Sequence, residues 1–342
     1  MTDDGEPAAG DIARIAQRLL GGPVDAVERI AGGGNNRLYL VSAGSTRFAL
    51  KHYATRDGDA RDRLGNEFNA LRLVAPKLPG SVPQPVAADP DSGWAAYEWI
   101  EGWRLLTGSP ADLDAMLDFV ARLLPLRSDP LAQELPSASE ACLSLAELIR
   151  QNHRRLARLR ESPDPSLRQF LAGELEPLLE AFAARALRSY AAAGIDPDAE
   201  LAPERRVLSP SDFGFHNMLL RPDGSRVFLD FEYFGWDDPA KLAADVTWHP
   251  AMCLPPEESR RFNDRMAALL AEDSEFPRRL AQFLPLIGIR WCLIVLNEFL
   301  PERWIRRRHA GGDGDWEAAK ARQLAKARVL YTAIVAGYHP SQ

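Results

Sequence analysis

The sequence has few cysteines and lacks the segments that would export a protein or hold it in a membrane. Its three cysteines are far apart and form no Cys-x-x-Cys pair or Cys/His cluster. We therefore expect neither a disulfide framework nor a zinc site, and interpret Cys142, Cys253 and Cys292 as core residues in a reducing compartment. Residues 1–11 are acidic and lack the apolar core of a signal peptide. The longest apolar segment, residues 283–300, contains proline and charged residues that argue against a membrane span. These features predict a cytoplasmic protein.

An excess of positive charge is also missing. The net charge is −7 and the pI is about 5.5, so nucleic acid is not expected as the main partner. The 342 residues are 46% hydrophobic and 26% charged, as in ordinary globular proteins, and this length suits two lobes better than one core. None of these properties indicates an oligomeric state.

The most informative stretch is Ser211–Glu232. Asp212 precedes Asn217 on a loop, and a second acid, Asp230, follows a turn. Alternating apolar residues flank Pro222-Asp223-Gly224, which is typical of a β-hairpin that would begin after Asn217 and end at Asp230. An Asn/Asp pair supplies hard oxygen ligands to Mg²⁺, and a separate carboxylate can deprotonate a hydroxyl, as phosphoryl transfer requires. Asp and Asn are also common in loops, so the spacing alone fits a purely structural role as well.

The N-terminal hundred residues carry a second set of features in a fixed order. Glycine-rich residues 32–36 precede two alternating segments, 37–41 and 47–53, that predict antiparallel strands. Lys51 lies on the second strand, and Glu67 lies beside the apolar stripe of a helical pattern. Glycines let backbone N–H groups approach phosphate oxygens, and a Lys–Glu ion pair would hold the ammonium against the α- and β-phosphates. Taken singly, a glycine triplet is more often a flexible turn, and a strand lysine is more often solvated.

This order of features is that of protein kinases, and the chain resembles the aminoglycoside phosphotransferase/choline kinase family of small-molecule kinases. The resemblance is most specific over Ser211–Asp245, where LDFEYFGWDDPAKLAAD is similar to the family's metal-binding segment. It implies an α+β, protein-kinase-like fold, with an antiparallel sheet plus helix in a small lobe and a larger, mainly helical lobe. It also implies transfer of the γ-phosphate of ATP to a hydroxyl of a small molecule with Mg²⁺, and GTP is an alternative donor.

By residue match, the resemblance implies a role for each motif residue. Asp212 would be the catalytic base, and Asn217 and Asp230 would be the Mg²⁺ ligands. Lys51 would bind phosphate with Glu67 as its partner. The nucleotide loop would consist of Gly32, Gly33, Gly34, Asn35 and Asn36.

One departure from the family pattern precedes the base. The family usually has His-Gly-Asp, whereas this chain has Pro210-Ser211-Asp212. Every group expected to touch phosphate or metal is retained, and Pro210 can stiffen the loop by fixing φ. The missing histidine leaves open a catalytically degenerate pseudokinase that binds nucleotide and acts as a scaffold. A helical binding module with a coincidental motif is a further alternative, and it predicts no ATP binding.

The boundary between the lobes is expected near residue 101, which gives an N-lobe of residues 1–101 and a C-lobe of residues 102–342. The segment WAAYEWIEG there has the pattern of a strand that leads into a polar turn. The resemblance makes it the hinge, where backbone groups of Glu98, Trp99 and Ile100 would bond the adenine edge. Beyond the hinge, helix starts are predicted at Ser109-Pro110, Ser137–Glu140 and Asp164-Pro165. A kink or division is expected at Pro177, and further helices are expected over 256–271, 277–300 and 316–338.

Acceptor-binding residues are expected after the metal-binding segment and on the C-terminal helices. The candidates are Glu232, Trp236, Arg290, Trp291, Asn297 and Glu298. The spacing of Arg290 and Asn297 places them on one face of a helix, where they either bond one another or face a cleft. An aminoglycoside, an amino alcohol and a sugar all fit as acceptor. Asp238 and Asp245 are interpreted as loop anchors, and His216 and His249 as packed or solvated residues.

Overall fold

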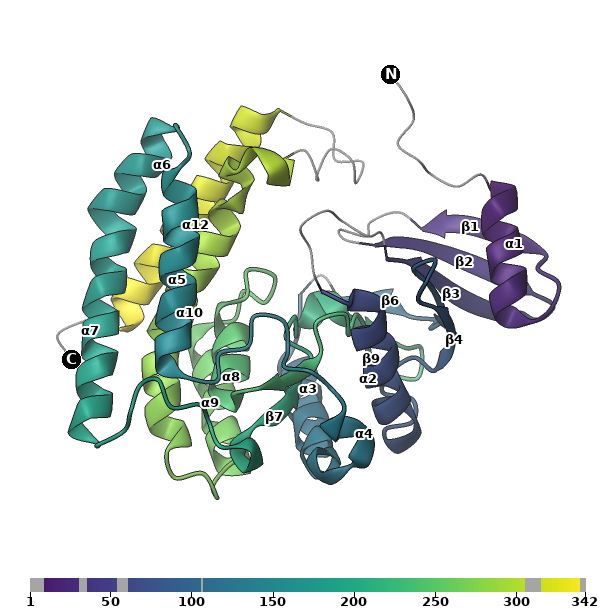
Figure 1. Ribbon diagram of the computed structural model, residues 1–342, viewed down its shortest axis with the longest axis horizontal. Helices are drawn as coiled ribbons and strands as arrows, with labels where there is room; N and C mark the ends of the chain where they lie inside the picture. Colours follow the sequence, from purple (N-terminus) through teal and green to yellow (C-terminus); the bar gives the residue numbers. More distant parts are fainter. Residues whose placement is uncertain (1–8, 31–35, 54–60, 106, 305–314, 339–342) are drawn as a thin grey trace. The chain divides into compact units, whose positions relative to one another are not determined.

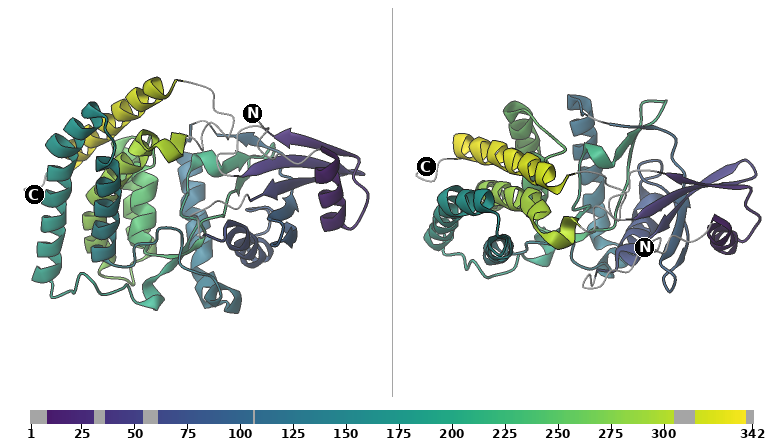
Figure 2. Two further views of the ribbon diagram at one scale, coloured as in Figure 1. Left: turned by 45° about the horizontal axis from the view of Figure 1, so that its top comes forward. Right: turned by 90° about the horizontal axis from the view of Figure 1, so that it is seen from above.

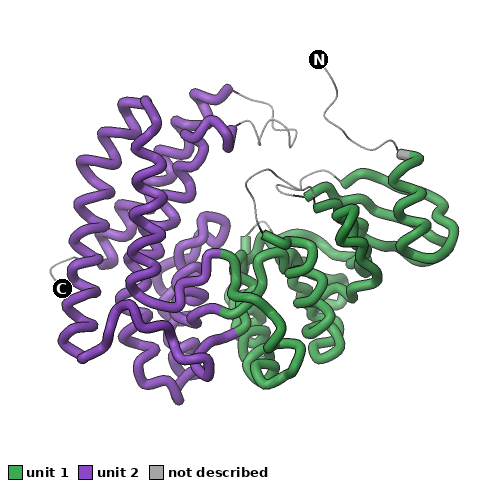
Figure 3. Tube along the Cα trace, viewed as in Figure 1, with its two compact units in different colours: residues 1–139, 208–236 green, residues 140–207, 237–342 purple. Residues whose placement is uncertain are grey.

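The chain folds into two compact units (Figure 3). The computed structural model describes residues 9–30, 36–53, 61–105, 107–304 and 315–338. The first unit comprises residues 1–139 and 208–236, and the second comprises residues 140–207 and 237–342. This division does not coincide with the expected lobe boundary, because residues 102–139 and 208–236 group with the N-terminal sheet. The hinge between an N-lobe and a C-lobe therefore stays a prediction.

The first unit contains the five-stranded and three-stranded sheets and helices α1 to α4 (Figure 1). Its N-terminal elements are α1 (Ala9–Leu20), β1 (Ala26–Ile30), β2 (Arg37–Ala43), β3 (Thr46–His52), α2 (Arg63–Lys77), β4 (Pro85–Asp89) and β5 (Trp94–Glu98). Its later elements are β6 (Trp103–Arg104), α3 (Pro110–Leu123), η1 (Leu124–Ser128), α4 (Pro130–Gln133), η4 (Phe215–Asn217), β8 (Met218–Leu220) and β9 (Arg226–Phe228). The chain passes between the units within β7 (Val207–Ser209) and β10 (Gly235–Asp237).

A five-stranded antiparallel sheet in the order β1-β2-β3-β5-β4 forms one end of the first unit. It confirms both predicted strands, which pair as β2 and β3. Side chains alternate between the two faces of the sheet. One face packs against α1 through the buried residues Ile12, Ala16, Tyr39, Val41, Leu50, Trp94 and Ala96. The opposite face presents Leu38, Ala49, Lys51 and Tyr97 to a pocket.

The predicted hairpin after Asn217 is also confirmed. Met218 pairs with Phe228 and Leu220 with Arg226, and β6 adds a third strand along β8. The second strand ends at Phe228, before Asp230. The expected end at Asp230 is therefore wrong, because Asp230 has a left-handed backbone with φ of 65° that cannot continue a strand.

The second unit is helical (Figure 2). Its elements are α5 (Leu145–Arg160), α6 (Pro165–Phe170), the π-helical turn η2 (Leu171–Leu175), α7 (Glu176–Ala192), η3 (Pro203–Arg205), α8 (Pro239–Trp248), α9 (Pro256–Leu269), α10 (Phe276–Val295), η5 (Leu296–Phe299) and α12 (Trp316–Gly337). The central helix α10 packs against α5, α7, α8 and α12. Residues 276–299 are long and apolar enough to cross a membrane, but 72% of their most apolar window is buried in the protein, as in a core helix.

Local signals at helix starts are mostly confirmed. Ser109 caps α3 with a complete capping box, and Asp164 caps α6 with Pro165 as its first residue. Helical structure continues from α6 into α7, so although a proline lacks an N–H and clashes with the preceding turn, no division occurs at Pro177. The π-helical turn η2 lies just before it and joins α6 to α7.

Three expectations are wrong. The segment Ser137–Glu140 starts no helix: Ser137 forms a β-bridge with Trp236, and α5 begins at Leu145 with Ser144 as its cap. Asn297 does not share a helical face with Arg290, because α10 ends at Val295 and Asn297 lies in the 3₁₀ turn η5. Cys253 is exposed, whereas the other two cysteines are buried as expected; all three are free thiols.

Candidate active site

A pocket of about 480 Å³ lies within the first unit. This volume is in the range of small-molecule sites. Its wall comes from the inner face of the five-stranded sheet, from β6 and from the β8–β9 hairpin. The lining residues are Ile30, Asn36, Leu38, Ala49, Lys51, Glu67, Pro83, Tyr97, Glu98, Trp99, Ile100, Gly102, Arg104, Asp212, His216, Asn217, Leu219, Leu229 and Asp230. Residues predicted from distant motifs therefore meet in one cavity.

Lys51 is the central cation of the pocket. Its Nζ donates to both carboxylate oxygens of Glu67, at 2.7 and 2.9 Å, and to Oδ1 of Asp230 at 3.1 Å. Burial alone lowers the pKa of the Lys51 ammonium, but the charges of Asp230 and Glu67 outweigh it and raise that pKa well above its usual value. Lys51 is therefore a permanent positive charge, and the predicted Lys51–Glu67 ion pair forms.

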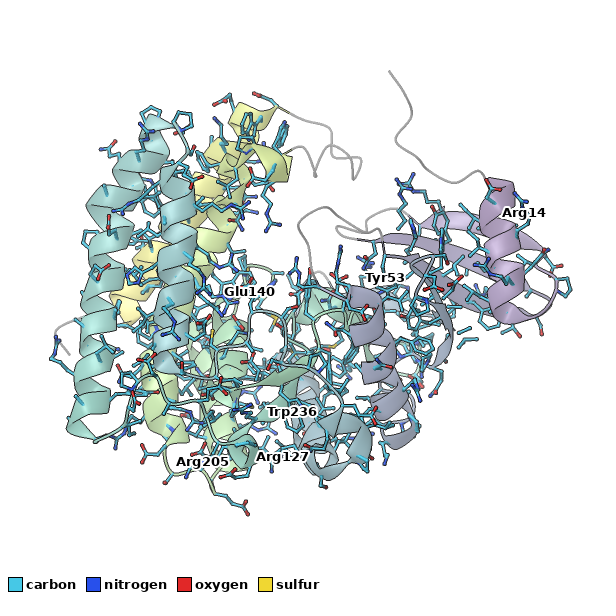
Figure 4. All side chains as sticks on the ribbon, in the orientation of Figure 1. Arg14, Tyr53, Arg127, Glu140, Arg205 and Trp236 are labelled. Atoms are coloured by element: carbon cyan, nitrogen blue, oxygen red, sulfur yellow. The ribbon has the colours of Figure 1, made fainter. Side chains whose placement is uncertain are left out.

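Two buried tyrosines support Glu67, and sequence reasoning did not identify them. The hydroxyl of Tyr53, labelled in Figure 4, donates to Oε2 of Glu67 at 2.6 Å and lies 2.8 Å from the Tyr97 hydroxyl. Glu67 is only 3% exposed, and its burial raises the pKa of its carboxyl group against the opposing effect of Lys51. The Tyr53 hydroxyl gives this buried carboxylate a hydrogen bond that water cannot supply there.

Asp212 lies on a tight loop with Asn217 and His216. The side-chain amide of Asn217 donates to the backbone oxygen of Asp212 at 2.9 Å, and Nε2 of His216 lies 3.0 Å from Oδ1 of Asp212. Ser211, at the position where the family has glycine, adopts a left-handed φ of 66°. Its backbone N–H donates to Ser209 Oγ and its hydroxyl donates to the Ser139 carbonyl, both at 3.1 Å. These bonds hold a conformation that glycine reaches more easily.

Asp230 approaches Asn217 through the hairpin backbone. The N–H of Leu229 donates to the Asn217 carbonyl at 2.8 Å. This backbone hydrogen bond brings Asp230, the residue after Leu229, close to Asn217. Asp230 has a left-handed backbone, which aspartate tolerates better than most residues, and its side chain is 37% exposed. The carboxylate therefore reaches the pocket even though Lys51 binds one of its oxygens.

An aromatic cluster packs against the loops that carry Asp212 and Asp230. Phe213 follows Asp212 and Phe231 follows Asp230, and the two rings lie 5.9 and 6.2 Å from Phe119 of α3. Sequence reasoning missed this cluster. In the sequence, the one sign of this cluster is the phenylalanine that follows each of the two acids.

The segment predicted as a hinge also lines the pocket. The N–H of Glu98 donates to Gln84 O at 2.8 Å, and that of Trp99 lies 3.4 Å from Arg47 O. Among the residues that the structure describes, the N–H of Ile100 has no hydrogen-bond partner, so this donor is available at the pocket wall.

Asn36 is the one residue of the predicted nucleotide loop that is described; Gly32, Gly33, Gly34 and Asn35 lie outside the described residues. Its amide donates to Oε2 of Glu232 at 2.6 Å. Glu232, predicted to bind the acceptor, is 1% exposed and is not part of the pocket lining. Its carboxylate instead ties the segment after Asp230 to the start of β2.

The other acceptor candidates are held by neighbours in their own units. Trp236 Nε1 donates to Ala132 O at 2.9 Å, and Trp291 Nε1 donates to Asp245 Oδ1 at 2.9 Å. Arg290 is 4% exposed, and the Glu298 carbonyl accepts from the indole of Trp316. Asn297 lies in η5.

Asp238 caps α8, Asp245 pairs with Lys241, and His249 packs edge-on against Trp291.

The chain is similar to known proteins in sequence family and in fold. Residues 26–283 match the phosphotransferase enzyme family (APH). No curated protein sequence matches the chain. Similar solved structures include choline kinase LicA from Streptococcus pneumoniae, with 16% identity, a TM-score of 0.59 and coverage of 95% of this chain and 98% of that chain. Spectinomycin phosphotransferase APH(9)-Ia, solved with ADP and spectinomycin, has 13% identity, a TM-score of 0.62 and coverage of 96% and 99%. Ethanolamine kinase from Plasmodium vivax has 17% identity, a TM-score of 0.54 and coverage of 91% and 83%.

The solved structures support a conclusion about the fold alone, because their sequence identities to this chain are low. The family match adds the chemistry, since it spans from β1 into α10 and includes every residue that lines the pocket. The chain therefore belongs to the phosphotransferase enzyme family and is a small-molecule kinase with an α+β, protein-kinase-like fold.

Proposed function

We propose that the protein transfers the γ-phosphoryl group of ATP to a hydroxyl of a small molecule, with Asp212 as the base. One observation carries the proposal: Lys51, paired with Glu67, shares one pocket with Asp212, Asn217 and Asp230. A purely structural role for these residues does not require three motifs from distant parts of the chain to meet at a cavity.

The pocket offers complementary groups to each part of ATP. Apolar side chains of Ile30, Ala49 and Leu219 suit an adenine ring, and the Ile100 N–H and the Glu98 carbonyl suit its hydrogen-bonding edge. Lys51 supplies a fixed cation for phosphate oxygens. The loop of residues 32–36 would cover the phosphates through its backbone N–H groups. GTP would use the same phosphate groups, and the base contacts would decide between the two donors.

Asn217 and Asp230 fit a magnesium ion by their chemistry. Both offer hard oxygen donors to the same pocket, and Mg²⁺ is held in kinase sites by one or two such ligands together with the substrate phosphates. An ion held by these two residues would supply positive charge that neutralises the phosphates. Lys51, whose Nζ donates to Asp230 at 3.1 Å, would hold that carboxylate in position.

Asp212 would orient the acceptor hydroxyl and accept its proton. The hydrogen bond from Asn217 to the Asp212 backbone fixes the loop, and His216 fixes one oxygen of the Asp212 carboxylate. The carboxylate of Asp212 faces the pocket, where it would receive the proton. Catalysis would rest mainly on this positioning and on the charge of Lys51.

For the acceptor we propose the class that the resemblance implies: an aminoglycoside, an amino alcohol or a sugar-like alcohol. Choline, ethanolamine and spectinomycin kinases among the similar structures support this class. The candidates Glu232, Trp236, Arg290, Trp291, Asn297 and Glu298 stay proposals for acceptor recognition. Three of them, Glu232, Trp236 and Trp291, have side chains that hydrogen-bond neighbouring protein groups.

The test combines binding with turnover. ATP at about 100 times its Kd should stabilise the protein by roughly 2.7 kcal/mol, and excess chelator should reduce the rise in melting temperature. Asp212→Asn should keep this rise and lower kcat by about 10²–10⁴ on any accepted alcohol. Asp223→Asn, an exposed change in the hairpin turn, is the matched control and should leave kcat unchanged. Stabilisation by ATP without turnover on any alcohol would indicate a pseudokinase, and no stabilisation by ATP or GTP would refute nucleotide binding.

A further inference from the structure

Arg290 of the second unit is a buried cation whose hydrogen bonds to the described residues are all long. Its Nη1 lies 3.4 Å from the Glu140 carbonyl and 3.5 Å from Cys142 Sγ, and its buried Nε has no hydrogen-bond partner among the described residues. Arg290 is 4% exposed. A guanidinium has five N–H donors, and buried groups of this kind are normally paired. The site therefore holds more donors than the protein satisfies.

A second arginine faces the same acceptor. Arg155 of α5 donates from Nη2 to Glu140 Oε2 at 2.8 Å, and Nη2 of Arg290 lies 3.8 Å from that same oxygen. The Nε of Arg155 is also buried without a partner in the described structure. Burial lowers the pKa of Arg155; Glu140 opposes this shift and Arg290 adds to it. Two guanidinium groups thus share one carboxylate oxygen.

The remaining acids nearby are already paired. Lys241 lies 2.9 Å from carboxylate oxygens of both Asp237 and Asp245. The indole of Trp291 donates to the other oxygen of Asp245 at 2.9 Å. Against the effect of burial, their charges help to raise the pKa of Arg290, but within the described part of the chain neither acid accepts a hydrogen bond from its guanidinium, so its Nε donor stays unsatisfied.

Among the side chains of Arg155, Arg290 and Glu140, that of Glu140 is the one that can move out into water. Its side chain is 43% exposed, that of Arg155 is 19% exposed, and that of Arg290 is only 5% exposed. Glu140, labelled in Figure 4, also has a left-handed backbone with φ of 59°, which glutamate rarely adopts. Water can take over the Glu140 carboxylate, whereas Arg290 has no such alternative.

We propose that Arg155 and Arg290 form a binding site for the oxyanion of a small molecule, a carboxylate or a phosphate, and that Glu140 holds its place when the ligand is absent. Guanidinium groups bind such planar or tetrahedral oxyanions through paired N–H donors, which satisfies the groups that Glu140 leaves unbonded. The oxyanion comes either from the phosphate acceptor or from free inorganic phosphate. The acceptor alternative rests on the proposed kinase function.

The first experiment reads the site without nucleotide. The melting temperature is measured against millimolar inorganic phosphate and against glycerate, at constant ionic strength in excess chelator. Wild type is compared with Arg155→Gln and with Arg154→Gln, an exposed neighbour on the same helix that pairs with Glu147. Wild type and Arg154→Gln should be stabilised, whereas Arg155→Gln should bind about tenfold or more weakly, as expected for losing a charged hydrogen bond. An unchanged melting-temperature rise with ATP and Mg²⁺ would show that Arg155→Gln is folded.

Glu140→Gln separates a ligand site from a structural ion pair. Removal of a competing carboxylate should tighten binding of the anion, whereas loss of a merely structural pair would leave it unchanged or weaken it. Equal stabilisation of wild type and Arg155→Gln, unchanged or weaker binding by Glu140→Gln, or no stabilisation by either anion would overturn the proposal.

The second experiment identifies the source of the oxyanion. ADP release is measured with alcohols that differ by one carboxylate: ethanolamine against serine, and glycerol against glycerate. If the acceptor carries the oxyanion, the carboxylated member reacts faster and loses its advantage in Arg155→Gln. If free phosphate is the ligand, the first experiment is positive and the members of each pair do not differ. If the kinase function is wrong, no alcohol releases ADP and ATP does not stabilise the protein, while the first experiment still reports on the arginines.

Discussion

Replacing Tyr53 with phenylalanine tests whether the buried hydroxyls hold the lysine site together. Tyr53→Phe removes one oxygen and leaves the ring in place. The lost hydroxyl bonds the Glu67 carboxylate at 2.6 Å and the Tyr97 hydroxyl at 2.8 Å. A hydrogen bond to a charged group contributes about 1.5–3 kcal/mol, and a buried hydroxyl left without a partner costs about 1–3 kcal/mol. Since Tyr97 is 2% exposed, we expect Tyr53→Phe to lower the free energy of unfolding by about 3 kcal/mol.

The variant Tyr97→Phe provides the contrast. It removes one neutral hydrogen bond and leaves Tyr53 bonded to Glu67, so it should cost only about 1 kcal/mol. In the double variant no tyrosine hydroxyl remains unpartnered, and its cost should be no greater than that of Tyr53→Phe alone. The three free energies of unfolding come from urea denaturation, with the ATP-induced rise in melting temperature as a check that each variant folds. Strictly additive costs, or a loss below about 0.5 kcal/mol for Tyr53→Phe, would show that the hydroxyls are not coupled.

Three further predictions concern stability and thiol chemistry. Arg279→Met leaves Asp238 buried and unpaired, and should cost about 3–5 kcal/mol in urea denaturation; a cost below 1 kcal/mol would contradict the pairing at 2.9 Å. A thiol reagent should label only Cys253 in the native protein, and labelling that survives Cys253→Ser would show that a buried cysteine is accessible. Burial and then a nearby arginine lower the pKa of His52 below 6.5, so its contribution to stability is present above about pH 6.5 and is lost as the pH falls. His52→Phe, which keeps the ring stacked on Trp94, should therefore lose less melting temperature than wild type between pH 7.5 and 5.5, and equal losses would exclude this role.

Features that depend on neighbours in sequence were predicted correctly. The strand of Lys51, the helix of Glu67 and the hairpin after Asn217 each follow from an alternation or a turn that a short window contains. Ser109 was found as a cap for the same reason. The order of these local signals sufficed to place the predicted motif residues in one pocket.

Features that depend on distant partners were missed. Ser137 has the spacing of a capping box, but its backbone bridges Trp236 instead of starting a helix. The ring of Phe119 packs on rings nearly a hundred residues later, and no window of sequence contains both. The left-handed backbone of Asp230 is set by the hairpin and by Lys51, so its residue type alone did not reveal it.

The path of the chain sets the order in which the protein can be completed during synthesis. The first unit takes residues 1–139 and then residues 208–236, with the intervening residues in the second unit. Strand β3, which carries Lys51, leaves the ribosome early, but Asp212 and Asp230 follow only after α5, α6 and α7 have been made. A nascent chain that ends before residue 208 therefore presents an open sheet face without its acids. Nucleotide can stabilise the protein only once the hairpin has emerged, and a gene fragment encoding residues 1–139 alone cannot provide a kinase.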